Sequence, residues 1–382
     1  MAQPGTASHA VTAPLKQIPA QIAALADYEA FAKDRLDPGA WAYINGGTGD
    51  GWTLRENVAA FARLPVRTRV LRSMQGASTA LNLFGCTMDA PILIAPMAFH
   101  GLCHPDGEAA TALAAGATGT TLIVSTQAGQ PIEQIAQGTP GPLWFQLYIQ
   151  PDRAFTERLV ARAEAAGYRA LVLTVDAPVN GVRNAEARAG FTLPPHIRAV
   201  NLEGMNHPAP GPEGALLFGT PLLESVPVWE DIAWLRTLTK LPILLKGIVD
   251  PEDARRALNC GVDGLIVSNH GGRTLDGVPA AIDLLPAISE AVGGQVPLLM
   301  DGGVRRGTDV LRALALGAKA VLVGRPILHA LATAGALGVA HALRVLRAEF
   351  ELAMALTGCR TLAEIDSDCL YQFVRDNPGD RR

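Results

Sequence analysis

The sequence predicts an α/β fold in which eight parallel strands, each followed by a helix, close into a barrel. Short, continuous apolar runs bounded by Gly, Pro or Asp recur from about residue 90 onward, as expected for strands that helices cover. Ala-, Leu- and Arg-rich segments with helical spacing separate them. Eight such units in about 240 residues are typical of a (β/α)8, or TIM, barrel. The predicted strands are Pro91–Pro96, Thr121–Thr126, Leu143–Ile149, Ala170–Asp176, Pro242–Ile248, Gly264–His270, Pro297–Gly303 and Ala320–Arg325.

The segments between these strands predict the helices, several of which begin with Pro or Asp and end at Gly. Two further helices precede the barrel and are followed by the glycine-rich run 46–51. That run lacks the glycine spacing and the preceding strand of a nucleotide loop, so we interpret it as a turn between helices. The predicted helices are Leu25–Arg35, Pro38–Ile44, Pro105–Ala117, Ile132–Gln137, Asp152–Ala166, Val228–Thr239, Pro251–Cys260, Ala280–Val292 and Arg306–Leu316.

One connection is longer than the others. Between Asp176 and Pro242 lie 65 residues rich in Pro, Gly and Asn. A long insertion at the active face of a barrel is usually a binding loop, so we predict a lid at about 184–227, after the fourth strand. The remaining organisation is an N-terminal arm, 1–24, expected to be flexible, followed by a single domain, 25–382.

Composition restricts the function. The chain has 382 residues, 49% of them apolar, and a formal charge of −4, which gives no basic surface for nucleic acid or an anionic membrane. The first 25 residues do not have the pattern of a secretory signal, and no stretch approaches the roughly 18 uninterrupted apolar residues that a membrane span requires. The cysteines are spread and odd in number, which favours a reducing, cytoplasmic location and predicts neither a disulfide framework nor a metal site. They are Cys86, Cys103, Cys260, Cys359 and Cys369.

The run Ser268-Asn269-His270-Gly271-Gly272-Arg273 follows a buried strand and carries a histidine and an arginine three residues apart. A guanidinium binds a carboxylate with two parallel hydrogen bonds while an imidazole accepts a proton. The pair therefore suits proton removal from a small anionic substrate. A purely structural histidine at a strand end is the alternative.

Other strand ends add polar residues, which a barrel brings to one face. Glycine amides and arginines after the last two strands suggest a phosphate site, with tight packing alone as the alternative. Lys246 ends another strand and could be a Schiff-base amine, a charge stabiliser or a core lysine with its amine near the surface. Together these residues suit flavin mononucleotide (FMN), with its ring over Ala95–Ala98 and Lys246 stabilising the negative charge of reduced flavin.

These motifs resemble the FMN-dependent L-2-hydroxyacid oxidase/dehydrogenase family over about residues 25–370. Ser-Asn-His-Gly-Gly-Arg-x-Leu-Asp, beginning at Ser268, is the family's signature. Within the family the chain is most similar to lactate oxidases and bacterial mandelate oxidases. That similarity lies in Tyr43–Gly47, Ala95–Gly101 and Leu173–Asp176.

The resemblance implies a role for each matching residue. His270 would be the base and Asp176 the carboxylate that orients it. Arg183 and Arg273 would bind the substrate carboxylate with help from Tyr43, and Tyr148 would hydrogen-bond the substrate oxygen. The residues that would contact FMN are Ala95, Pro96, Met97, Ala98, Ser125, Gln146, Thr174, Lys246, Ser268, Asp301, Gly302, Gly303, Arg305, Gly324 and Arg325.

The implied reaction is oxidation of a lactate- or mandelate-like L-2-hydroxy acid to the 2-oxo acid, with dioxygen as acceptor and hydrogen peroxide as product. The resemblance also implies a homotetramer or homo-octamer. At two positions where lactate oxidases carry tyrosines, this chain has Leu193 and Phe218 in our alignment. The loss of two hydroxyl groups would make the mouth of the pocket more apolar. Two alternatives stay open: a dehydrogenase using a quinone or another acceptor, and a flavin-free phosphate-binding isomerase or lyase with Lys246 as its nucleophile.

Overall fold

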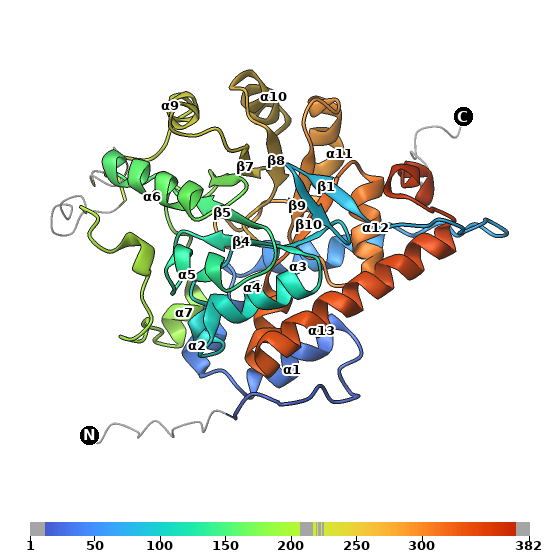
Figure 1. Ribbon diagram of the computed structural model, residues 1–382, viewed down its shortest axis with the longest axis horizontal. Helices are drawn as coiled ribbons and strands as arrows, with labels where there is room; N and C mark the ends of the chain where they lie inside the picture. Colours follow the sequence, from blue (N-terminus) through green and yellow to red (C-terminus); the bar gives the residue numbers. More distant parts are fainter. Residues whose placement is uncertain (1–11, 207–216, 219, 221–222, 224, 372–382) are drawn as a thin grey trace, which may run out of the picture.

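The computed structural model describes residues 12–206, 217–218, 220, 223 and 225–371. Eight parallel strands close into a barrel in the order β10-β3-β4-β5-β6-β7-β8-β9 (Figure 1). This confirms the predicted TIM barrel. Each observed strand lies inside the run that predicted it. The strands are β3 (Ile92–Ile94), β4 (Thr121–Ser125), β5 (Leu143–Leu147), β6 (Leu171–Thr174), β7 (Ile243–Ile248), β8 (Gly264–Val267), β9 (Leu298–Asp301) and β10 (Ala320–Val323).

The predicted helices surround the barrel, and their observed ends differ by a few residues at most. Acidic side chains cap several of them: Asp152 accepts a hydrogen bond from the Phe155 N–H (2.9 Å), and Asp250 accepts one from the Glu252 N–H (2.7 Å). The predicted helices correspond to α4 (Gly107–Ala117), α5 (Ile132–Gln137), α6 (Arg153–Ala165), α9 (Glu230–Leu238), α10 (Pro251–Asn259), α11 (Ala281–Val292) and α12 (Gly307–Ala315). A further helix, α13 (Arg325–Thr357), follows β10.

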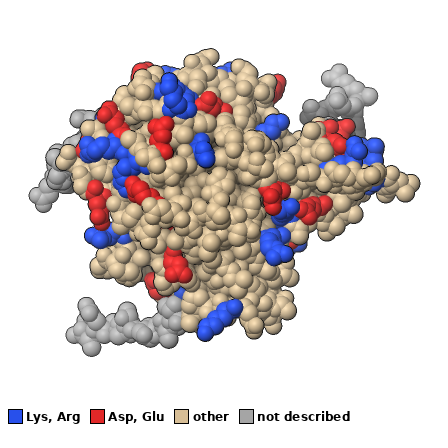
Figure 2. Space-filling model, in the orientation of Figure 1, with Lys and Arg blue, Asp and Glu red and all other residues tan. Residues whose placement is uncertain are grey.

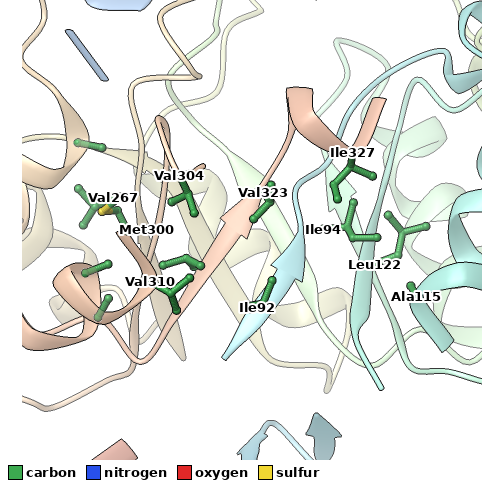
Figure 3. Close-up of a cluster of buried hydrophobic side chains, with 14 of the residues drawn as sticks. Ile92, Ile94, Ala115, Leu122, Val267, Met300, Val304, Val310, Val323 and Ile327 are labelled. Atoms are coloured by element: carbon green, nitrogen blue, oxygen red, sulfur yellow. The ribbon is translucent and has the colours of Figure 1, made fainter. Parts of the chain in front are cut away.

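The apolar residues form two layers. The inner layer fills the barrel with side chains such as Leu93, Trp144 and Leu299. The outer layer lies between strands and helices, and Figure 3 shows a part of it, where Leu122 and Ile327 lie near each other. Because every barrel strand packs on both faces, its residues are continuously apolar, which is the pattern that made the strands recognisable.

The N-terminal part contains η1 (Leu25–Asp27), α1 (Tyr28–Lys33), α2 (Pro38–Asn45), α3 (Trp52–Ala59) and η2 (Ala60–Arg63). The glycine-rich run 46–51 lies between α2 and α3, as predicted, whereas α3 itself was not predicted. The Asp276 carboxylate accepts hydrogen bonds from the N–H groups of Asp50, Trp52 and Thr53 (2.8–3.2 Å). Asp276 lies more than 200 positions after the start of α3 in the sequence. The local sequence around α3 therefore carries little sign of where this helix begins.

A small hairpin, β1 (Leu81–Leu83) and β2 (Cys86–Met88), was also not predicted. Its side chains pack into the inner apolar layer, and the Trp144 indole N–H donates to the Cys86 sulfur (3.4 Å). Three-residue strands are too short to produce a readable alternation.

Helix α13 was not predicted either. It has non-helical backbone angles at Ala334 and Gly335, and it packs against α1 and α12 (Figure 1). Within the described residues it is the one helix long and apolar enough to cross a membrane. In its most apolar window 78% of the residues are buried inside the protein, as in the core helix of a folded domain.

The flexibility of the N-terminal arm, 1–24, stays a prediction, and the structure shows where part of the arm contacts the fold. Residues 1–11 lie outside the described part, but residues 12–24 dock on the fold: the Leu15 N–H donates to the Thr333 carbonyl (2.7 Å), and Ile22 is buried. The predicted lid contains α7 (Asn184–Arg188) and η4 (Val200–Leu202), and part of it, at 207–216, 219, 221–222 and 224, lies outside the described residues.

On the face drawn in Figure 2, Lys and Arg are interspersed with Asp and Glu.

Gly307, the first residue of α12, tests the packing of α12 against α13. A Cβ atom there would lie 2.1 Å from the backbone N of Phe350, which belongs to α13. This clash is with backbone and not with a flexible side chain, so the two helices would have to move apart. We expect Gly307→Ala to lower the free energy of unfolding by about 3 kcal/mol, measured as a shift of the urea midpoint by circular dichroism.

Gly138, at the end of α5, is the matched control. Its added Cβ would lie at an ordinary 3.5 Å from the nearest atom, and its φ is −86°. We expect Gly138→Ala to change stability by less than about 1 kcal/mol. Equal midpoints for the two variants would contradict the close approach of α12 and α13.

Candidate active site

A cavity of about 940 Å³ lies at the carboxyl ends of the barrel strands. This volume is within the roughly 300–1,000 Å³ typical of ligand pockets. All predicted site residues line the cavity except Asp176 and Ser268, which hydrogen-bond to residues that do. The barrel therefore brings together residues from position 43 to position 325.

His270 follows β8 and has a left-handed backbone conformation, with φ of +57°. Non-glycine residues adopt this conformation rarely and at a cost in energy, which is common at functional sites. The Ser268 hydroxyl accepts a hydrogen bond from the His270 N–H (3.0 Å). The His270 Nδ1 atom lies 2.8 Å from Asp176 Oδ1. These contacts hold the imidazole at the cavity wall.

Asp176 determines which ring nitrogen of His270 carries the proton. Burial raises the pKa of Asp176, but the nearby His270 and Lys246 and the hydrogen bond from His270 outweigh it, and the pKa lies below its ordinary value. An ionised carboxylate only accepts hydrogen bonds, so Nδ1 of His270 is the donor. In a neutral imidazole the other nitrogen, Nε2, is then the free proton acceptor.

Gly247 makes the approach of Asp176 possible. It lies at an irregularity in β7 with φ of +112°, and a Cβ atom there would be 2.4 Å from the Asp176 Cβ. Any side chain at position 247 would therefore displace the carboxylate that holds His270.

Lys246 is buried on β7. Its Nζ lies 2.9 Å from Asp301 Oδ2 and donates to the Ser268 hydroxyl (2.9 Å). Burial lowers the pKa of Lys246, but the negative charges of Asp301 and Asp176 more than offset this, so the pKa is raised. The amine is therefore charged. A charged amine suits stabilisation of a negative ligand and does not suit nucleophilic attack.

Arg183 and Arg273 share one carboxylate, that of Glu186. Its Oε1 lies 3.3 Å from an Arg273 terminal nitrogen and 3.7 Å from Arg183 Nε. The other terminal nitrogen of Arg273 donates to the carbonyls of Tyr43 (2.7 Å) and Gly46 (2.9 Å). One terminal nitrogen of Arg183 is buried without a hydrogen-bond partner in the described structure. The arrangement leaves hydrogen-bond donors for an anion at the cavity wall.

Glu186 was not among the predicted site residues. It lies on α7, three residues after Arg183, and lines the cavity. The i,i+3 spacing to Arg183 is a sequence signal, but the contact with Arg273, 87 residues away, depends on the tertiary fold. The two departures from lactate oxidases, Leu193 and Phe218, are not among the residues that line the cavity, and Phe218 is 85% exposed.

Two tyrosines complete the wall. Burial is the main cause that raises the pKa of Tyr148 to about 12, and burial also raises the pKa of Tyr43. Both phenols are therefore protonated at neutral pH and can donate hydrogen bonds. Arg273 lies over the Tyr43 ring, 5.1 Å from its centroid, which fixes the ring and the guanidinium relative to each other.

The predicted phosphate site carries unpaired positive charge. Burial lowers the pKa of Arg305 and of Arg325, and the neighbouring arginines lower that of Arg325 further. Neither forms an ion pair with a carboxylate in the described part of the chain. Arg325 donates to the carbonyls of Ile44, Gly46 and Gly271 (2.9–3.0 Å). Buried, mutually repelling arginines favour a bound anion such as a phosphate group.

Two polar side chains that line the cavity each carry an atom without a partner in the described structure. Gln146 Nε2 and Asp301 Oδ1 are both buried and have no hydrogen-bond partner among the described residues. They are a donor and an acceptor at the ends of β5 and β9. Such buried groups normally bind something, and a flavin with its polar ring edge and ribityl hydroxyls would satisfy them. The residues therefore fit FMN, although the contact of each one with FMN stays a prediction.

Comparisons with known proteins agree with this geometry. A model of the FMN-dependent dehydrogenase family matches residues 32–372. An L-lactate oxidase of Nostoc sp. is 46% identical over 355 residues, 91% of this chain and 97% of that protein. Glycolate oxidase 1 of Zea mays is 45% identical over 348 residues, 90% of this chain and 94% of that protein. A solved structure of mandelate oxidase with benzoyl-formic acid has a TM-score of 0.82 at 40% identity, covering 89% of this chain and 96% of that one.

The chain therefore belongs to the FMN-dependent dehydrogenase family. This confirms the predicted family, the FMN cofactor and the reaction class, FMN-dependent oxidation of a 2-hydroxy acid. The alternative of a flavin-free isomerase or lyase is wrong, and the buried ion pair of Lys246 explains why its amine is not the nucleophile.

Glu186 gives a test of the anion site. A ligand carboxylate must share Arg183 and Arg273 with Glu186, so removing that charge should strengthen anion binding. We expect Glu186→Gln to lower the Kd of a 2-oxo acid for the FMN-loaded protein about five-fold, or about 1 kcal/mol, by titration calorimetry.

Glu203→Gln is the control, because Glu203 is an exposed carboxylate of the same insertion that pairs with Arg198. We expect its Kd to equal that of the unchanged protein. A Kd that rises ten-fold in Glu186→Gln would mean that Glu186 holds the arginines in place instead of competing with the ligand.

Proposed function

We propose that the protein oxidises a lactate- or mandelate-like L-2-hydroxy acid to the corresponding 2-oxo acid, with dioxygen as electron acceptor and hydrogen peroxide as product. Atoms balance as hydroxy acid plus dioxygen giving oxo acid plus peroxide. FMN supplies the two-electron acceptor for the acid when it is bound. The remaining tasks, orientation of the acid and removal of its hydroxyl proton, belong to side chains of this chain.

The observation that carries the proposal is the His270–Asp176 pair beside two arginines. With Nδ1 of His270 donating to Asp176 (2.8 Å), Nε2 is the free acceptor for the substrate's hydroxyl proton. The charge that then develops on the imidazolium is stabilised by the ionised Asp176. A 2-hydroxy acid must lose this hydroxyl proton, together with its α-hydrogen and the two electrons that FMN would accept, to become a 2-oxo acid.

The arginines and tyrosines orient the substrate. Arg183 and Arg273 provide the donors for its carboxylate, and the protonated Tyr148 can donate to the oxygen that becomes the ketone. When the carboxylate is fixed beside His270, the hydroxyl group lies within reach of the base. The orientation lowers the entropic part of the reaction barrier.

The cavity lining supports a substrate with an apolar side chain. Met97 and Phe99 follow β3, and Leu202, Val226 and Trp229 line the cavity from the long insertion. Relatives of this chain include L-lactate oxidases and mandelate oxidase, whose substrates carry a methyl and a phenyl group. We therefore propose acids of this size range over those with a second charge.

The decisive experiment is anaerobic mixing of the yellow protein with L-lactate and, separately, L-mandelate, followed by air. Loss of flavin absorbance with rapid recovery and peroxide formation would support an oxidase and rank the two acids. Loss without rapid recovery would favour the dehydrogenase alternative with a quinone or another acceptor. No loss with either acid would count against both substrates.

We also propose a cytoplasmic homotetramer or homo-octamer. The odd cysteine count supports the first part, and the family resemblance supports the second. Light scattering during size-exclusion chromatography tests the assembly, and a mass of 40.1 kDa, that of one chain, would contradict it.

His270→Ala tests the base. We expect kcat to fall by about 10²–10⁴ because the proton acceptor is removed, while the protein stays yellow because FMN binding does not require the imidazole. The measurement is peroxide formation together with the flavin spectrum. His196→Ala, at an exposed position of the insertion, is the control and should retain full activity. Near-normal activity of His270→Ala would contradict the assigned base.

Arg273→Lys tests the carboxylate site. A lysine keeps the charge but not the two parallel donors, so we expect KM to rise about ten-fold or more with a smaller change in kcat. Steady-state kinetics measures both. Arg188→Lys, an exposed arginine of α7, is the matched control. An unchanged KM in Arg273→Lys would remove this residue from substrate binding.

A further inference from the structure

Two cysteines that the proposed reaction does not use lie in contact near the end of the described chain. Cys359 follows the C-terminus of α13, and Cys369 ends η6 (Ser367–Cys369). Their sulfur atoms are 3.5 Å apart, and the two residues are only 4% and 6% exposed. Neither lines the candidate active site. The other three cysteines have no such contact in the described structure.

Both cysteines are held in place by hydrogen bonds that involve the surrounding backbone. The Cys359 thiol donates to the Glu364 carbonyl (3.3 Å), which closes the turn between the cysteines. On the other side, the Cys369 carbonyl accepts a hydrogen bond from the Arg67 N–H (2.8 Å), and Leu370 pairs with Val66 in an antiparallel bridge. The contact between the sulfurs is therefore part of the junction between the C-terminal segment and the loop before β1.

We propose that Cys359 and Cys369 are a modification site that a peroxide oxidises to a disulfide. One thiolate attacks a peroxide oxygen, the O–O bond breaks, and a sulfenic acid and one water form. The second thiol then displaces the sulfenic oxygen as another water, and the S–S bond forms. In total two thiols and one hydrogen peroxide give one disulfide and two waters.

The geometry requires little movement. A disulfide has its sulfurs about 2.05 Å apart, so the two atoms need to approach by about 1.5 Å. The short 3₁₀ segments between the cysteines, η5 (Leu362–Glu364) and η6, can supply this shift without moving α13. The product would close a loop of about ten residues and link the C-terminal segment covalently to the end of α13.

Burial limits the rate of this reaction. It raises the pKa of the Cys359 thiol to about 11, so little thiolate is present at neutral pH. We therefore expect slow conversion that depends on sustained exposure to peroxide. The internal source of that peroxide rests on the proposed function, whereas the reactivity of the pair does not.

The test uses the FMN-loaded full chain and added hydrogen peroxide. We expect the number of thiols titrated after denaturation to fall from five to three per chain, and a peptide pair linking Cys359 to Cys369 to appear with a mass about 2 Da below the sum of the reduced peptides. The Tm should rise by about 3–6 °C and return on reduction.

Three variants identify the pair. Cys369→Ser should prevent the linked peptide and the Tm shift, and the sulfenic acid trapped by dimedone should then appear on Cys359. Cys359→Ser should also prevent both and carry the trapped sulfenic acid on Cys369. Cys260→Ser, the control at a half-buried cysteine without a thiol partner in the described structure, should behave as the unchanged protein. Five titratable thiols after prolonged exposure, or loss of thiols confined to other cysteines, would overturn the proposal.

A second arm replaces added peroxide by turnover of the 2-hydroxy acid in air. The linked peptide under both conditions supports the pair and the internal source. The linked peptide with added peroxide alone supports the pair and counts against the proposed peroxide production. Its absence under both conditions, with peroxide measured in solution, overturns the disulfide while leaving the proposed function intact.

Discussion

Closure of the barrel is the constraint on which the candidate site depends. Strand β10 pairs with β3, with Val321 opposite Ile92 and Val323 opposite Ile94, although these strands are more than 200 residues apart. Because all eight strands are parallel, their carboxyl ends meet in one mouth. Without this closure the segment Ala95–Ala98 after β3 and Arg325 after β10 would lie at opposite edges of an open sheet, and no cavity would join them.

Many charged side chains are buried at the mouth of the barrel, and most of the positive ones are paired with a carboxylate. Lys246 is paired with Asp301, His270 with Asp176, and Arg273 with Glu186. Each of these pairs uses a carboxylate that another element supplies. Buried charges are tolerated only when paired or hydrogen-bonded. Arg305 and Arg325 have no such carboxylate in the described structure, so the positive charge there is left for an anionic cofactor to balance.

The backbone has an unusual conformation directly after β8, next to the proposed base. His270 and the next two glycines all have positive φ values, and a Cβ at Gly272 would lie 2.6 Å from the Leu54 backbone N. The chain therefore turns sharply after β8 and passes close to α3. This turn aims the imidazole back at Asp176 and the following Arg273 at Tyr43. The same turn appears in the sequence as two adjacent glycines between the histidine and the arginine.

The amino-acid sequence alone determined the barrel, its strands and most of its helices, because buried parallel strands require continuous apolar runs. It also determined the motif from Ser268 to Arg273, because a sharp turn and a base need particular residues in a short span. Only the tertiary structure decided the contacts between distant segments. Helix α3 is capped by Asp276, Glu186 reaches Arg273, the arm at 12–24 docks on α13, and Cys359 meets Cys369. These pairings depend on how the closed barrel folds its covering segments back on one another, which no local pattern of residues records.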